Sequence, residues 1–446
     1  MDRFGGRHSS TNYRAVAAYE DAVLGIASHR PTATPALQLA VAADPDFTAA
    51  HALKGLAAVI LAREELLAPA RAALAEAEAA HAAHGGCTSS ERALISALGE
   101  AVDGRLTAAA DLVDRHLAAQ PCDLLAIKLS HGLRFMRGDS TGMLAATSSV
   151  LPAWDPSMPG YGFLQGCHAF GLEECGQLGA AELAGHMALE HEPADAWAVH
   201  AVSHVHETQG LNKHGVSWLE GARPVWSRCN NLSFHMAWHL ALLHVEQQRD
   251  DQALDIYDAE VRPQPTDDFR DMANAVSLLW RLHQEGVDVG HRWDELRDIA
   301  RHRRDDTTLM FASLHYLMAL VATGETAAAH ELLAAVAARG VSGHGDQARV
   351  AAEVGLGLAK AILGIADRRT GRMALDQLAK ATPQLGGSHI QRDVFVRTLA
   401  LLAADQGDRA AVARILAQRT LLGREDRFSA RLLARLDAAA ALPRAS

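Results

Sequence analysis

The sequence predicts an all-α protein in which antiparallel helix pairs stack into an α-solenoid. Alanine and leucine dominate the chain, and Val, Ile or Thr runs that alternate with polar residues are missing. Apolar residues recur at intervals of three and four, as in "AAHALKGLAAVILA" at 49–62. Helices of this kind joined by short polar turns form either a bundle or a solenoid, and an internal period distinguishes the two.

Such a period is present. The stretches "DPDFTAAHA" at 44, "QPCDLLAIK" at 120 and "EPADAWAVH" at 192 each place a proline and a capping aspartate before an apolar helix start. Pro121 and Pro156 are 35 residues apart, and Pro156 and Pro193 are 37 apart. Both intervals are close to the tetratricopeptide period of about 34 residues. We therefore expect a tetratricopeptide-like α-solenoid, curled into a superhelix with an interior groove or pocket.

The same pattern suggests one domain over residues 1–446. No Pro-, Ser- or Gly-rich linker and no charge block interrupts the series. We expect N-terminal helices at 1–45, helical repeats at 46–420 and a capping helix at 421–446. The last helix could instead join two copies into a homodimer.

Composition restricts the classes of partner. The 446 residues are 49% hydrophobic, enough for a large core, and the formal net charge of −11 comes from interspersed charges. This balance argues against a nucleic-acid surface and against docking on an anionic membrane. The N-terminus lacks the apolar core of a secretory signal, so we expect a cytoplasmic protein with a small-molecule or protein partner. Five scattered cysteines favour reduced thiols over disulfides.

Two histidine pairs are the main candidate functional residues. His200 and His204 are four residues apart, as are His235 and His239, so each pair shares one helix face. The second pair follows the first by 35 residues, which predicts equivalent positions on neighbouring helices and four imidazoles facing one groove. Glu207 lies on the same face as His200 and His204.

Several kinds of chemistry suit such a group. His-x-x-x-His on one helix face can bind Zn²⁺ or another divalent transition metal. Clustered imidazoles can also exchange protons with a substrate or bind an anion. A histidine in an apolar helix can equally be a hydrogen-bonded packing residue. No motif as specific as His-Glu-x-x-His is present, so the sequence leaves open whether the protein is an enzyme and which metal it binds.

Four more polar residues are expected beside the groove. A further advance of 35 residues from the second histidine pair reaches Arg270 and Asn274. Glu173 and Glu174 end the helix that precedes the first pair. Adjacent acids at a helix end usually lie in a solvated turn, but one of these could be a ligand or a base.

Two further sites leave alternatives open. In "LGGSHIQRDVF" at 385–395, Arg392 could fix a carboxylate or phosphate group in the groove, or it could contact Asp393 within a capped helix start. His315 is a lone histidine in the apolar stretch "MFASLHYLMAL", where packing is the favoured interpretation.

The stretches "AFGLEE", "DAWAVHAVSHVHETQG", "FHMAWHLALLHVE", "SLLWRL" and "GGSHIQRDVF" resemble the tetratricopeptide repeat protein 38 family, and the similarity extends from about Asn12 to about Arg419. The resemblance implies an all-helical tetratricopeptide-like fold but no reaction. The sequence departs from the family pattern at Ser313, where an acid is expected, and at His389, where a small residue is more usual. The positions that match the family motifs are Glu173, Glu174, Asp195, Trp197, His200, His204, Glu207, His235, His239, Trp280, Arg281, His315, Arg392 and Asp393.

The matched polar residues are spread over five or more helices, which favours a small-molecule pocket over a peptide-docking strip. We therefore expect an interior pocket that binds, and could transform, a small polar or anionic molecule. The four histidines would be metal ligands or acid/base groups, a glutamate such as Glu207 or Glu174 would be their partner, and Arg392 an anchor. The alternative is a non-enzymatic adaptor that binds a protein segment in its concave groove.

Overall fold

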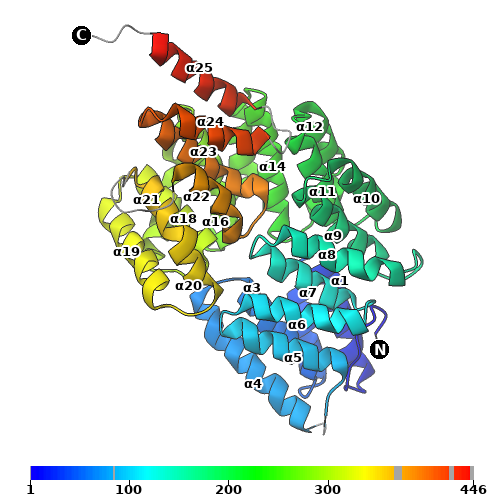
Figure 1. Cartoon of the computed structure of the whole chain (residues 1–446). Helices are drawn as coiled ribbons and strands as arrows, with labels where there is room; N and C mark the ends of the chain where they lie inside the picture. The colour runs from blue at the N-terminus through cyan, green and yellow to red at the C-terminus, as the bar shows by residue number, and fades with distance from the viewer. Residues whose placement is uncertain (1, 84–85, 366–373, 421–425, 442–446) are drawn as a thin grey trace. The chain divides into compact units, whose positions relative to one another are not determined.

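The computed structural model describes residues 2–83, 86–365, 374–420 and 426–441, and every regular element in these ranges is helical (Figure 1). This confirms the predicted all-α class. No helix in these ranges is long and apolar enough to cross a membrane. The helices up to residue 191 are α1 (Tyr13–Ala27), α2 (Ala33–Ala43), α3 (Thr48–Ile60), η1 (Glu64–Leu66), α4 (Leu67–Ala83), α5 (Ser89–Val102), α6 (Leu106–Ala119), α7 (Leu124–Phe135), α8 (Ser140–Val150), η2 (Leu151–Ala153), α9 (Tyr161–Glu174) and α10 (Leu178–His191).

The second half of the chain continues in the same way, with two short π-helical segments, η3 and η5. Its helices are α11 (Ala196–Thr208), α12 (Asn212–Gly221), α13 (Arg223–Trp226), α14 (Leu232–Glu246), α15 (Asp250–Ile256), η3 (Tyr257–Val261), α16 (Phe269–Gln284), η4 (Gly290–Arg292), α17 (Trp293–His302), α18 (Met310–Ala322), α19 (Thr326–Ser342), α20 (Asp346–Val350), η5 (Ala351–Gly355), α21 (Leu356–Ile362), α22 (Leu375–Ala381), η6 (Thr382–Leu385), α23 (His389–Asp405), α24 (Arg409–Thr420) and α25 (Arg427–Ala441).

Consecutive helices pack as antiparallel pairs joined by short turns. Helix α9 packs mainly against α10, α3 against α4, and α5 against α6. The first helices of successive pairs, α9, α11 and α14, begin at residues 161, 196 and 232, which are 35 and 36 residues apart. The predicted repeat spacing is therefore present in this part of the chain.

Turn residues explain where these helices end. The chain leaves α9 through Gly176 with φ of 75° and leaves α11 through Gly210 with φ of 70°. This left-handed conformation favours glycine because a Cβ would crowd the backbone. After α14 the corresponding residue is Gln248, which adopts φ of 61°.

Internal contacts divide the chain into two compact units. One unit contains the chain up to Val202, Gly221–Met236 and His344–Gln347. The other contains Ser203–Glu220, Ala237–Gly343 and the chain from Ala348 onward. The predicted single solenoid over 1–446, with its C-terminal cap or homodimer contact, stays a prediction.

Candidate functional site

The first histidine contact lies in the first unit. His200 of α11 and His235 of α14 place their Nε2 atoms 3.0 Å apart, with ring centroids separated by 4.9 Å. His200 is buried, whereas His235 is half-buried. The 35-residue register therefore pairs these two imidazoles as the sequence predicts.

Trp197 is the centre of an aromatic cluster around His200. Its ring lies 4.7 Å from the rings of both Phe170 and His200, measured between centroids, and His29 stacks on it at 5.3 Å. The indole N–H of Trp197 donates a hydrogen bond to Nε2 of His131 over 3.2 Å. The packing of His200 is thus fixed by large side chains from α7, α9 and the turn after α1.

A buried carboxyl group holds the start of α11. Asp195 accepts a hydrogen bond from the backbone N–H of Trp197 over 3.0 Å. Complete burial raises the pKa of Asp195 to about 7, although the nearby Lys128 ammonium acts against this rise. Burial, with a smaller contribution from Lys128, lowers the pKa of His131 to about 3, so this imidazole is neutral.

The second histidine contact lies in the other unit. Nδ1 of His239 is 2.9 Å from Oε2 of Glu207, and both side chains are almost fully buried. The ring of His204 lies 4.7 Å from that of His239, and His389 at the start of α23 meets His204 edge-on at 5.8 Å. Because a carboxylate accepts only, Nδ1 of His239 carries the proton, and Nε2 of the neutral ring keeps its lone pair.

Both contacts belong to the same two helices, one turn apart. In the first unit, the Nε2 atoms of His200 and His235 approach to 3.0 Å, and in the second unit the rings of His204 and His239 lie 4.7 Å apart, measured between centroids. Imidazole nitrogens at such separations can share one divalent transition metal ion.

Arg270 and Asn274, the predicted groove residues of α16, stay a prediction. Helix α16 begins at residue 269, 37 residues after α14. Counted from the helix starts, a 35-residue advance falls one position short between α11 and α14 and two positions short between α14 and α16, so Arg270 and Asn274 keep the register less closely than the histidines do. Arg270 holds Asp268 through two hydrogen bonds of 2.9 and 2.6 Å, and Asn274 is buried in α16.

The remaining sequence candidates lie on other helices. Glu173 and Glu174 end α9 in the first unit, with Glu173 buried and Glu174 half-buried. His315 of α18 donates from Nδ1 to the carbonyl oxygen of Phe311 over 2.7 Å and packs on Phe395 at 5.1 Å. Burial lowers the pKa of His315 to about 4. These contacts agree with the packing interpretation of His315.

The glycine turn before α23 is followed by the capped helix start that the sequence suggests, and the cap is a capping box. The Ser388 side chain accepts from the N–H of Gln391, whose side chain accepts in turn from the N–H of Ser388. Arg392 is buried and donates to the Gly387 carbonyl oxygen. Asp393 pairs with Arg419 of α24 through hydrogen bonds of 2.7 and 3.0 Å.

The sequence candidates did not include Lys128, His131, His29 or the contact of His389 with His204. For Lys128 and His131 of α7, the repeat interval was a signal in the sequence. This helix begins 72 residues before α11, which places Lys128 at the position of His200, and His131 lies within one residue of the position of His204. His29, in a turn with φ of 55°, and His389 carry no such repeat signal.

Comparisons with solved structures find matches that cover most of this chain at low sequence identity and low TM-score. No family model matches the chain. The chain is similar to the crystal structure of yeast Tom70 at 11% identity and a TM-score of 0.35, with 96% of this chain and 89% of that chain covered. A structure of Naa15/Naa10 bound to HypK-THB matches at 14% identity and a TM-score of 0.26, covering 96% of this chain and 66% of that one. The P58(IPK) TPR domain matches at 15% identity and a TM-score of 0.21, covering 80% and 90%.

Proposed function

We propose that this helical-repeat protein holds a divalent transition metal ion on His200, His204, His235 and His239, and that a small polar or anionic molecule binds at this ion. The observation that carries the proposal is the close approach of the two Nε2 atoms of His200 and His235, 3.0 Å apart. Two nitrogens bound at about 2.0–2.1 Å to one tetrahedral ion are about 3.3 Å apart. A shift of a few tenths of an ångström would therefore convert the contact into a ligand pair.

The surroundings of His239 support the same proposal. Glu207 accepts a hydrogen bond from Nδ1–H of His239 over 2.9 Å, which leaves Nε2 as the coordinating atom. Carboxylates that hydrogen-bond to a metal-bound imidazole orient the ring and increase its basicity. A purely structural histidine in an apolar helix needs no buried carboxylate beside it, because burying that charge is costly.

Differences in burial support access for a further ligand. His200, His204 and His239 are buried, whereas His235 is half-buried. If three histidines bind the ion permanently, the fourth position can be taken by water or by an oxygen of a small polar molecule. Whether such a molecule is also transformed stays a prediction from the sequence, as does the tetratricopeptide repeat protein 38 resemblance.

The test is elemental analysis of purified, untagged protein. We expect one equivalent of a transition metal in the wild type, its loss in His200→Gln and weaker binding in His235→Gln. The control is His51→Gln, which removes a buried histidine that contacts Glu76 and Pro45 instead. Folded wild-type protein that takes up no Zn²⁺, Cu²⁺, Ni²⁺ or Fe²⁺ at micromolar concentration would contradict the proposal and favour the adaptor alternative.

A further inference from the structure

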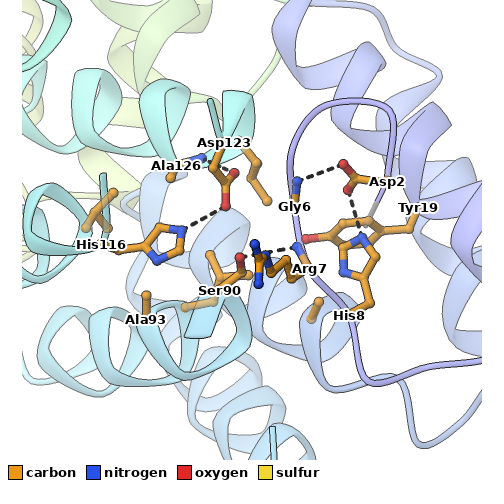
Figure 2. Close-up of a pocket in the computed structure, with 14 residues that line it drawn as sticks. Asp2, Gly6, Arg7, His8, Tyr19, Ser90, Ala93, His116, Asp123 and Ala126 are labelled. Atoms are coloured by element: carbon orange, nitrogen blue, oxygen red, sulfur yellow. Dashed lines mark hydrogen bonds and ion pairs between the residues drawn. The ribbon is translucent and has the colours of Figure 1, made fainter. Parts of the chain in front are cut away.

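A second polar site lies in the first unit, near the start of the chain. Figure 2 shows a pocket between the segment 2–8, Tyr19 of α1 and the helices α5, α6 and α7. Its cavity volume is about 20 Å³, which is room for about one water molecule or an ion of that size. Its polar lining comes from Asp2, Arg7, His8, Tyr19, Ser90, His116 and Asp123.

The segment that closes this pocket is firmly attached. The N–H of Arg7 donates to the Ser90 hydroxyl over 3.2 Å, and the Thr88 hydroxyl donates to the carbonyl oxygen of Arg7 over 2.6 Å. The N–H of Leu124 donates to the carbonyl oxygen of Phe4 over 3.0 Å. The pocket is therefore part of the folded unit.

Three buried carboxylates lie at or near the pocket. Asp2, Glu91 and Asp123 are 6%, 0% and 5% exposed. Asp2 accepts from Nε2 of His8 over 2.8 Å, and Asp123 accepts from Nε2 of His116 over 2.9 Å. Their other contacts, and all of those of Glu91, are with backbone N–H groups and hydroxyls. In the described part of the chain, no lysine or arginine forms an ion pair with any of the three.

When His8 and His116 are neutral, these side chains leave the region of the pocket with net negative charge. Buried carboxylates are stable only when a cation or a strong set of hydrogen bonds compensates them. The same three carboxylates act on Tyr19. Its pKa is raised well above the usual value, first by burial and then by the charges of Asp123, Asp2 and Glu91. The phenol is therefore neutral and can accept a hydrogen bond inside the pocket.

His8 adds a second, independent observation. Its side chain is 4% exposed, and Nδ1 is buried without a hydrogen-bond partner. Because Nε2 donates to Asp2 when the ring is neutral, Nδ1 is then a lone-pair acceptor. The His8 ring borders the cavity (Figure 2). A buried acceptor without a donor is destabilising, so the site calls for a ligand that donates hydrogen bonds.

We infer that this pocket binds an ammonium ion. Ammonium is about the size of water, carries the missing positive charge and donates four hydrogen bonds. The pocket lining includes His8, whose Nδ1 is buried without a partner, and the oxygen-bearing side chains of Tyr19, Asp2 and Asp123. An imidazole nitrogen among the acceptors favours ammonium over a hard alkali cation, which prefers oxygen ligands only. Arg7 also belongs to the pocket lining, but its side chain is exposed, and its backbone N–H donates to Ser90.

The test is calorimetric titration of the full chain with ammonium chloride in tetramethylammonium chloride at constant ionic strength. We expect saturable binding of one ammonium ion and a matching rise in the melting temperature. Asp123→Asn should weaken binding at least tenfold, because it removes a charge while the amide oxygen can still accept from the N–H of Ala126. The control is Asp139→Asn, which makes the same change at the N-cap of α8, outside the pocket lining.

Other outcomes would overturn the inference. Equal or tighter binding of K⁺ or Na⁺ would make the pocket an alkali-cation site. The absence of any cation effect, together with His8 and His116 imidazoles that NMR finds doubly protonated at pH 7, would show that the protein supplies its own compensating charge. If Asp123→Asn does not fold, Tyr19→Phe removes one acceptor and should still weaken ammonium binding, whereas unchanged binding would contradict the site.

Discussion

Trp197 donates its indole N–H to Nε2 of His131 over 3.2 Å, across 66 positions of the sequence. The acceptor nitrogen must carry a lone pair, so the proton of neutral His131 is on Nδ1. Burial lowers the pKa of His131 to about 3, which keeps the ring in this neutral form at physiological pH. The hydrogen bond therefore fixes both the tautomer of His131 and the orientation of the indole beside His200.

Trp197→Phe should destabilise the protein by about 1–3 kcal/mol, because it leaves Nε2 of His131 buried without a donor. Urea unfolding measures the change in free energy of unfolding. In the double variant Trp197→Phe/His131→Leu the orphaned acceptor is gone, so the double variant should lose less stability than the sum of the two single changes. Additive losses would show that the hydrogen bond contributes nothing beyond packing.

Glu207→Gln should weaken binding of the proposed metal by about 10- to 100-fold, because a neutral amide polarises Nδ1–H of His239 less than a carboxylate does. Competition with a chromophoric chelator measures the affinity. The matched control is Glu76→Gln, since Glu76 contacts Nδ1 of His51 over 3.0 Å in the same manner but is exposed. If both variants bind metal like the wild type, Glu207 has no role in orienting a ligand.

Asp195 should make stability depend on pH. Its pKa is raised to about 7 in the folded protein, against about 3.9 in an unfolded chain. The folded state therefore binds more protons between these values, and its stability falls as the pH rises from about 4 to about 7. Asp195→Asn, whose amide oxygen can still accept from the Trp197 N–H, should be more stable than the wild type at pH 8, by about 1–3 kcal/mol.

The difference in free energy of unfolding between Asp195→Asn and the wild type, measured by urea unfolding, should be smaller at pH 5 than at pH 8. His315 provides a control of opposite sign, because its pKa is lowered to about 4 by burial. Between about pH 4 and pH 6.5, the imidazole of residue 315 is protonated more in the unfolded chain than in the folded protein. The protein therefore loses stability on acidification through this range, and His315→Gln should reduce that loss. An Asp195→Asn advantage that is the same at both pH values would show that Asp195 does not change its charge over this range.

The repeat register made part of the histidine group predictable. His200 and His235 lie within one residue of equivalent places on helices that begin 36 residues apart, and local helix geometry supplies their partners His204 and His239. The register is looser at α16, because η3 and the loop after it lengthen the interval between helix starts to 37 residues. A repeat period predicts neighbours only where the connecting segments keep their length.

Contacts between non-equivalent positions could not be predicted in this way. His29 reaches Trp197 from a turn and His389 reaches His204 from the first residue of α23. Neither contact follows from helix periodicity, because it depends on how turns pack on helices far away in the sequence. Asp393 likewise pairs with Arg419 of the next helix, a contact that the local sequence around Arg392 does not indicate.

Gly166→Ala should destabilise the first unit even though alanine is the better helix former. A Cβ at this position of α9 would lie 2.0 Å from Oδ2 of Asp195, so the carboxyl group that caps α11 would have to move. We expect a loss of about 1–3 kcal/mol in urea unfolding, as for other overpacked sites. Gly132→Ala in α7 is the matched control, because no atom lies within 4 Å of the added Cβ, and it should stabilise the protein by about 0.5–1 kcal/mol. Equal stabilisation by both changes would show that α9 does not approach the Asp195 carboxyl group this closely.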